Sequence, residues 1–183
     1  MAATIAFALA LGFVLALRIQ QERQARHRNG EKVVLGSSAS WVEGLKSDPS
    51  LDSSEIEKLR DLAKRGNPAA ENAMGLLYAR GDEKHAIKQD QNEAVRWFTK
   101  AAEDGSVPAQ YKMGLLYWGG HGVPKDASKA YFWAVLALAG GQEGSEDLTK
   151  VLADGMTRAQ TAAIEQQAEI WFHHRQAQTK RPK

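Results

Sequence analysis

Residues 74–78, Met-Gly-Leu-Leu-Tyr, recur unchanged as residues 113–117, and this repetition decides the fold. The offset of 39 residues continues outside the pentapeptide, because Leu62-Ala63-Lys64-Arg65-Gly66 aligns with Ala101-Ala102-Glu103-Asp104-Gly105. A period of this length is typical of helical repeat arrays, in which each unit buries its apolar face against its neighbours. The sequence therefore predicts an α/α solenoid with two full repeats.

Each repeat is predicted to contain two antiparallel helices. The first helices are expected over residues 68–79 and 108–118, each with a proline near its start, where the missing N–H costs nothing. The second helices are expected to begin after the N-caps Asp90 and Asp126, with Glu93 completing a capping box in the first repeat. Small and aromatic residues at i, i+3 and i+7 mark the buried faces of these second helices. They are Ala94, Trp97 and Ala101 in the first repeat and Ala130, Trp133 and Ala137 in the second.

The combined pattern A-x-x-x-L/M-G-x-x-Y-x-x-G, then D-x-x-x-A-x-x-W-x-x-x-A-x-x-G, resembles the Sel-1-like repeat family. The resemblance covers residues 66–141 and is most specific at residues 117–126, Tyr-Trp-Gly-Gly-His-Gly-Val-Pro-Lys-Asp, which are similar to the family's loop. Residues 82–85 depart from that loop pattern in the first repeat. The resemblance implies a tetratricopeptide-like α/α solenoid that serves as an adaptor or scaffold in membrane-associated complexes.

Capping helices are expected on both sides of the repeats, because a repeat array must cover its terminal apolar faces. Before the repeats, residues 54–65 are predicted to be helical, with Ser54 and Glu57 as a capping box. After them, the sequence predicts a short helix over 145–153 and a longer one over 157–175, the latter with Thr157 and Gln160 as its capping box. Residues 131–139, Tyr-Phe-Trp-Ala-Val-Leu-Ala-Leu-Ala, are apolar on every side of a helix, so the helix over 157–175 is expected to cover them.

Residues 2–17, AATIAFALALGFVLAL, contain one polar side chain and no charge. As a helix they would span about 25 Å, close to the roughly 30 Å hydrocarbon layer of a bilayer. We therefore predict a single transmembrane helix. Its membrane-anchoring residues are Ile5, Phe7, Leu9, Leu11, Phe13, Val14, Leu15 and Leu17.

Basic residues follow this apolar segment, and Arg18, Arg23, Arg26 and Arg28 are expected to contact lipid headgroups. The positive-inside rule then places the folded domain in the cytoplasm. The alternative is a cleaved export signal, which would leave a soluble periplasmic protein-binding module. That alternative lacks the basic segment that normally precedes the apolar run of a signal peptide.

The region between the apolar segment and the repeats is rich in Ser and Gly, which indicates a linker. Within it, Trp41, Val42 and Leu45 are expected to form a short turn that docks onto the folded domain. The predicted organisation is a membrane helix with its basic extension over residues 1–28, a linker over 29–53, the α/α repeat domain over 54–175 and a basic tail over 176–183.

The sequence contains no recognisable catalytic, metal or cofactor motif. It has no Cys, and its five His residues show no metal-ligand spacing. Residues 119–122, Gly-Gly-His-Gly, follow a predicted helix and precede no Lys-Ser/Thr pair, so they do not fit a phosphate-binding loop. The net charge of +2 is too small to indicate nucleic acid as the main partner. We expect no catalytic residue, no metal and no cofactor, with a regulatory enzyme as a remote alternative.

Protein partners are expected on the face of the first helices opposite Gly75 and Tyr78. In the second repeat this face carries large aromatic residues, which are good anchors for a partner. The alternative is that the amino-terminal linker folds back over the same face. The partner-binding candidates are Asn72, Leu76, Tyr111, Leu115 and Trp118. The sequence thus predicts a non-catalytic, membrane-anchored scaffold or accessory subunit that binds other, membrane-embedded protein subunits.

Overall fold

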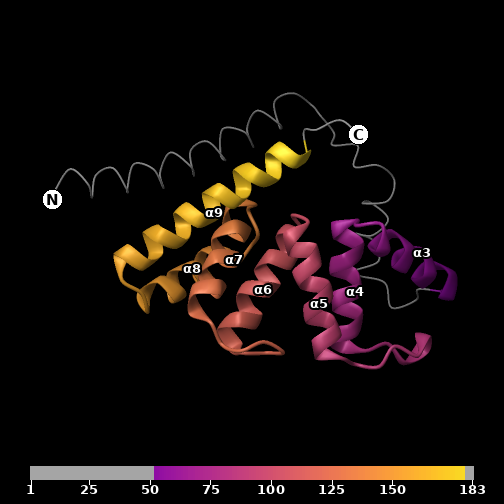
Figure 1. Ribbon diagram of the computed structural model, residues 1–183. Helices are drawn as coiled ribbons and strands as arrows, with labels where there is room; N and C mark the ends of the chain where they lie inside the picture. Colours follow the sequence, from indigo (N-terminus) through magenta and orange to yellow (C-terminus); the bar gives the residue numbers. More distant parts are fainter. Residues whose placement is uncertain (1–51, 180–183) are drawn as a thin grey trace.

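The computed structural model describes residues 52–179, which form an all-α, solenoid-like domain (Figure 1). The predicted membrane helix, its headgroup-binding arginines, most of the linker and the end of the basic tail lie outside these residues. Within the described range there are seven α-helices, one short 3-10 helix and no β-strand. The helices are α3 (Ser53–Lys64), α4 (Pro68–Arg80), η1 (Glu83–His85), α5 (Gln91–Glu103), α6 (Val107–Gly119), α7 (Ala127–Ala139), α8 (Ser145–Asp154) and α9 (Arg158–Thr179).

The helices from α3 to α8 stack in chain order, each packing against the next, and α4 with α5 and α6 with α7 form the two closest pairs. These pairs are the two predicted repeats. Helix α9 leaves this order and lies across the row, where it packs on α7 and points its carboxyl end towards the α5–α6 turn (Figure 1). Gly66 and Gly105 have φ values of 80° and 87° between helices, so they provide the left-handed residues that end α3 and α5.

The start of α3 corrects one prediction. The N-cap is Asp52 rather than Ser54: the Asp52 carboxylate accepts from the Glu55 backbone N–H at 2.9 Å, and Glu55 accepts from the Asp52 N–H at 2.8 Å. Asp52-x-x-Glu55 and Ser54-x-x-Glu57 both fit a capping box. The earlier pair starts the helix, and Glu57 instead forms an ion pair with Arg60.

The second helices begin where the sequence predicted. Asp90 accepts hydrogen bonds from the backbone N–H groups of Asn92 and Glu93, and Asp126 accepts one from Lys129. The proposed capping box at Glu93 is wrong, because this side chain pairs with Arg96 at 3.0 Å. The box before α9 is confirmed by the reciprocal hydrogen bonds between Thr157 and Gln160.

Helix α7 is covered on two sides, by α8 and α9, as its uniformly apolar sequence predicted. The ring centroids of Trp133 and Trp171 lie 6.1 Å apart in an edge-to-face arrangement. The Tyr131 hydroxyl donates to Glu165 of α9 at 2.7 Å, and burial together with this carboxylate raises the pKa of Tyr131. Helix α9 therefore closes the apolar end of the array.

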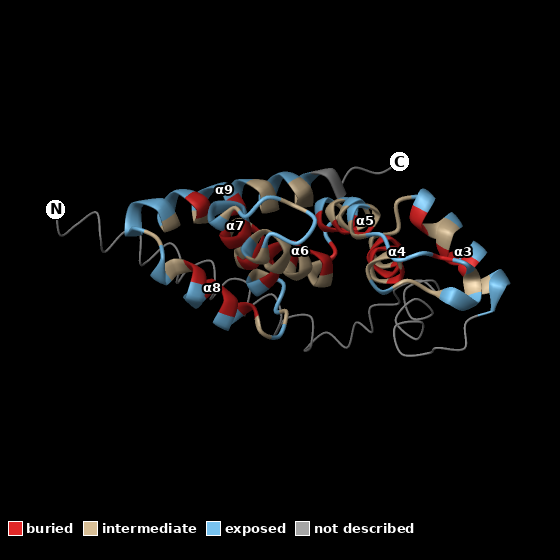
Figure 2. Ribbon diagram, turned by 90° about the horizontal axis from the view of Figure 1, so that it is seen from below, coloured by how far each residue is buried: buried red, intermediate tan, exposed pale blue. Residues whose placement is uncertain are grey.

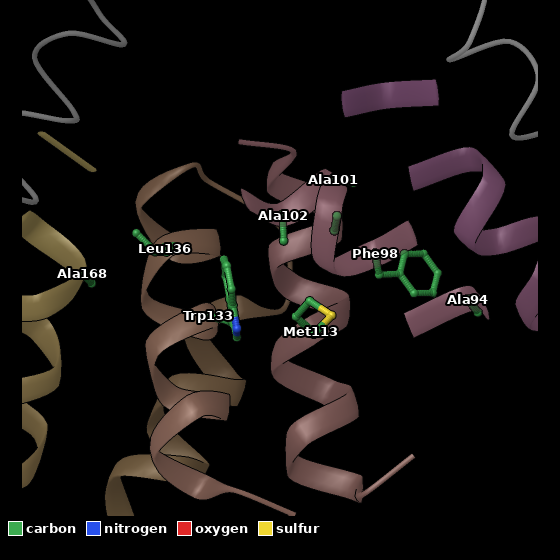
Figure 3. Packing of buried hydrophobic residues seen from close by; sticks show 9 residues of the cluster. Ala94, Phe98, Ala101, Ala102, Met113, Trp133, Leu136 and Ala168 are labelled. Carbon is green, nitrogen blue, oxygen red and sulfur yellow. The ribbon is translucent and has the colours of Figure 1, made fainter. Parts of the chain in front are cut away.

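The two glycines of the repeated pentapeptide set how closely neighbouring helices approach. A Cβ on Gly75 would lie 2.6 Å from the ring of Phe98 on α5. A Cβ on Gly114 would instead lie 3.3 Å from the backbone oxygen of Ala130 on α7. Met113 and Trp133 face each other beside this contact (Figure 3), and buried segments line the facing sides of α4 to α8 (Figure 2).

None of the helices in residues 52–179 combines the length and apolar content that a membrane crossing requires.

Candidate interaction surface

Trp118 is the most exposed of the five partner-binding candidates. It lies at the carboxyl end of α6, and 50% of its surface is exposed. The equivalent residue of the first repeat is Ala79 on α4. An exposed tryptophan that distinguishes one repeat from the other is a suitable anchor for a partner.

Asn72 is buried, which corrects its predicted place on an open face. Only 2% of its surface is exposed, and its Oδ1 atom has no hydrogen-bond partner. Helix α4 lies between α3 and α5, and the six consecutive residues 70–75 are all buried. The prediction assumed that one face of α4 was open, whereas two neighbouring helices cover it along this stretch.

Leu76, Tyr111 and Leu115 are half-buried and belong to the edges of the core. Leu76 packs against the apolar cluster centred on α5, α6 and α7, whereas Tyr111 and Leu115 pack against the cluster of α7, α8 and α9. The Tyr111 hydroxyl closely approaches Gly144, where an added Cβ would lie 2.8 Å from it. The turn before α8 therefore covers part of Tyr111.

The loop of the first repeat contains a partly buried Asp–His pair that the sequence did not predict. Oδ2 of Asp82 lies 2.8 Å from Nδ1 of His85, while the other ring nitrogen, Nε2, is buried without a partner. Burial opposes ionisation of Asp82, but the hydrogen bonds from the ring and the backbone N–H of His85 prevail and lower the pKa of this carboxyl. The Asp82–His85 pair stabilises η1 and the loop around it, in which Ile87 is buried.

A fully buried carboxylate lies at the junction of α3, α4 and α5. Oε1 of Glu71 is 2.8 Å from Nζ of Lys100, which also donates to the carbonyl oxygen of Ala63 at 3.2 Å. Burial raises the pKa of Glu71, and the Lys100 ammonium offsets part of that rise. The carboxyl group of Asp104 is a second acidic neighbour of Glu71.

Asp104 also receives a hydrogen bond from Nη2 of Arg175 on α9, at 3.1 Å. Beside this ion pair, a cleft of about 300 Å³ opens between the amino end of α6, the carboxyl end of α7 and α9. Val107, Leu136, Trp171 and Phe172 form its apolar walls. The sequence predicted that the helix over 157–175 covers residues 131–139, but it did not predict a cleft between this helix and α6.

Within residues 52–179, His, Asp and Glu residues nowhere assemble in groups of three that could hold a metal ion. The Glu71 carboxylate is enclosed by the helices around it. Taken together, the stacked helix pairs, the exposed Trp118 and the apolar cleft define a helical repeat protein with surfaces for binding.

Comparisons with known proteins agree with this class. The Sel1 repeat model matches residues 68–106 and 107–142, the two helix pairs described above. A protective antigen of uropathogenic Escherichia coli strains, described as having an SLR fold, aligns with a TM-score of 0.58 and 24% identity, over 79% of this chain and 36% of that one. A Sel1 repeat protein from Oxalobacter formigenes aligns with a TM-score of 0.53 and 26% identity, over 73% of this chain and 98% of that one.

The two helix pairs thus match the Sel1 repeat model, and the two solved structures share the helical repeat fold of this chain. Sel1 repeats generally bind protein partners, and the fold is typically a non-catalytic scaffold. The chain spans 36% of the length of the Escherichia coli antigen, so that protein has regions with no counterpart in this alignment.

Proposed function

We propose that this chain is a non-catalytic scaffold or accessory subunit that binds protein partners within a membrane complex. The observation that carries the proposal is the half-exposed Trp118 at the end of α6, where the first repeat has a small alanine. Exposed aromatic residues supply much of the binding energy in protein interfaces. Leu115, one turn before Trp118 and partly buried, would extend the contact along α6.

The membrane part of the proposal rests on the sequence of residues 1–28. The uncharged run over 2–17 has nearly the length that one bilayer crossing needs, and four arginines follow it. In this arrangement the linker joins the membrane helix to α3, and the repeats stand in the cytoplasm. The scaffold would then hold its partners close to the membrane surface.

Two measurements on the full-length protein test this proposal. After membranes are washed with alkaline carbonate, the protein should remain in the pellet, and its intact mass should include residues 2–17. Release into the wash, together with a mass lacking the apolar segment, would favour the exported periplasmic module instead.

Partner binding is tested by purifying the tagged protein from membranes solubilised in a mild detergent. Trp118→Ala should reduce the amount of co-purified protein partner at least tenfold, since truncating an interface anchor commonly costs about 2 kcal/mol or more. Ile170→Ala is the matched control, because Ile170 is 52% exposed on α9, away from α6. Equal recovery of the partner with both variants would argue against the proposed surface.

A further inference from the structure

Three of the residues that line the cleft between α6, α7 and α9 replace a charged cluster of the first repeat. Glu71, Lys100 and Asp104 form a charged cluster in the first repeat, in which only Glu71 is fully buried. The residues at the same repeat positions are Gln110, Leu136 and Gly140, and all three line the cleft. The second repeat therefore has a neutral amide, a shorter apolar side chain and no side chain at all where the first has its charged cluster.

The size and walls of the cleft fit a large apolar side chain. Its volume of about 300 Å³ is at the lower limit of small-molecule sites, which usually have about 300–1,000 Å³. Trp171 and Phe172 form one wall, and aromatic rings gain additional stability from edge-to-face or offset contact with another ring. Arg175, at the rim, already pairs with Asp104, and its other guanidinium N–H groups can donate to an acidic residue next to the inserted side chain.

We propose that Trp41, in the segment preceding α3, occupies this cleft, with Glu43 beside Arg175. Trp41 is the only Phe, Trp or Tyr residue between Phe13 and Tyr78. The rest of this linker offers Val and Leu side chains but no other aromatic ring. The chemistry of the segment, an aromatic residue followed two positions later by an acid, matches the aromatic wall and the arginine of the cleft.

The length of chain between Trp41 and α3 allows this contact. Helix α3 has 12 residues and is therefore about 18 Å long. Its carboxyl end is next to the cleft, because a Cβ on Gly66 would lie 3.9 Å from Oδ2 of Asp104, which lines the cleft. The eleven residues from Trp41 to Asp52 reach about 36–40 Å when extended, which is enough to run back along α3 to the rim.

The contact would fix how the linker leaves the folded domain. It does not depend on a membrane anchor or on Trp118, so its experimental test is independent of the test of the proposed function. It also gives the linker turn a specific site, whereas the sequence alone predicted only that this turn docks on the domain.

Cysteine pairs test the contact directly, because the natural chain contains no Cys. The full-length variant Glu43→Cys/Val107→Cys should form an intramolecular disulfide under mild oxidation, since Val107 lines the cleft. In the matched control Glu43→Cys/Val151→Cys, the second cysteine is on α8 at a residue that is 51% exposed. We expect the cleft pair to cross-link at least tenfold faster than the control pair.

Adding Trp41→Ala to the cleft pair should slow cross-linking to the rate of the control pair, while Trp41→Phe should preserve most of it. Circular dichroism checks that each variant remains helical, and a Val107→Leu variant without cysteines reports whether that wall tolerates change. Equal rates for the two cysteine pairs, or a rate unaffected by Trp41→Ala, would overturn the proposal. Disulfides formed only between two chains would also overturn it, because the segment would then occupy the cleft of a second copy.

Discussion

Glu71 and Gln110 occupy the same position in the two repeats. In each repeat, a carbonyl oxygen near the end of the preceding helix receives a hydrogen bond, but the donor differs. Gln110 donates its side-chain amide directly to the carbonyl oxygen of Ala102 at 3.3 Å. Glu71 cannot donate when ionised, and Lys100 bridges it to the equivalent carbonyl oxygen of Ala63. Leu136 replaces Lys100 in the second repeat, so the acid and its lysine change together.

Because the acid and the lysine change together between the repeats, substitutions at positions 71 and 100 should have strongly non-additive effects on the free energy of unfolding. Lys100→Leu alone should destabilise the protein by about 3 kcal/mol, because removing one partner leaves a buried charge without compensation. The double variant Glu71→Gln/Lys100→Leu recreates the pair of the second repeat and should lie within about 1 kcal/mol of the natural protein. Urea denaturation of the two single variants and the double variant measures the coupling.

Lys58→Leu serves as the control for the loss of a lysine, because this residue is exposed on α3. Additive effects at positions 71 and 100 would contradict the bridging role of Lys100.

The raised pKa of Glu71 predicts a pH dependence with a definite sign. The folded protein binds the Glu71 proton more tightly than the unfolded chain, in which this carboxyl has its usual pKa of 4.5. The resulting stabilisation is fully present below pH 4.5 and is lost as the pH rises through the raised pKa of the folded state. Of the charged groups beside Glu71, the Lys100 ammonium lowers its pKa and the Asp104 carboxylate raises it.

As the pH rises from 4.5, the unfolding free energy of the natural protein should therefore fall relative to that of the Glu71→Gln variant. Denaturation at a series of pH values and constant salt measures this difference, with Glu103→Gln as a control for removal of an exposed carboxylate. A difference that stays constant, or shifts in the opposite direction, is inconsistent with the burial of Glu71.

The glycines of the repeated pentapeptide predict a second coupling, specific to the first repeat. Gly75→Ala should destabilise the protein by up to about 2 kcal/mol, because overpacking against Phe98 costs about 1–3 kcal/mol and the gain in helix propensity returns about 1. In a Phe98→Ala background, the same change should be neutral or stabilising. Ala134 occupies the position of Phe98 in the second repeat, so a small residue is compatible with this helix pair.

Gly114→Ala is the matched control for this coupling. Its Cβ would meet Leu148 and the α7 backbone instead of Phe98, so its effect should be the same with and without Phe98. If Phe98→Ala relieves both substitutions equally, the contact between Gly75 and Phe98 does not set the helix spacing.

The helices themselves could be predicted because their signals are local. The repeated pentapeptide, the Asp N-caps and the helix-ending glycines all act within a few residues, and the two repeats confirmed one another's register. The start of α3 was misplaced for the same reason, since two overlapping capping boxes fit the sequence and the structure forms the earlier one.

The interaction surface was harder to predict because it depends on where distant helices lie. Asn72 is buried by α3 and α5 together, and a helical wheel of α4 alone does not include both neighbours. The cleft likewise depends on the path of α9, which brings Trp171 and Arg175 to the end of α6. Periodicity identifies which face of a helix is apolar, but it does not show how completely two apolar faces close against each other.

The central claim, that α6 presents a binding site for a protein partner, is tested most directly by photo-cross-linking in intact cells. A photoreactive benzophenone amino acid placed at position 118 should attach the full-length chain to one discrete protein partner. The same amino acid at position 170, which is equally exposed on α9, should not. Cross-links to protein of equal yield from both positions, or none from position 118, would contradict the claim.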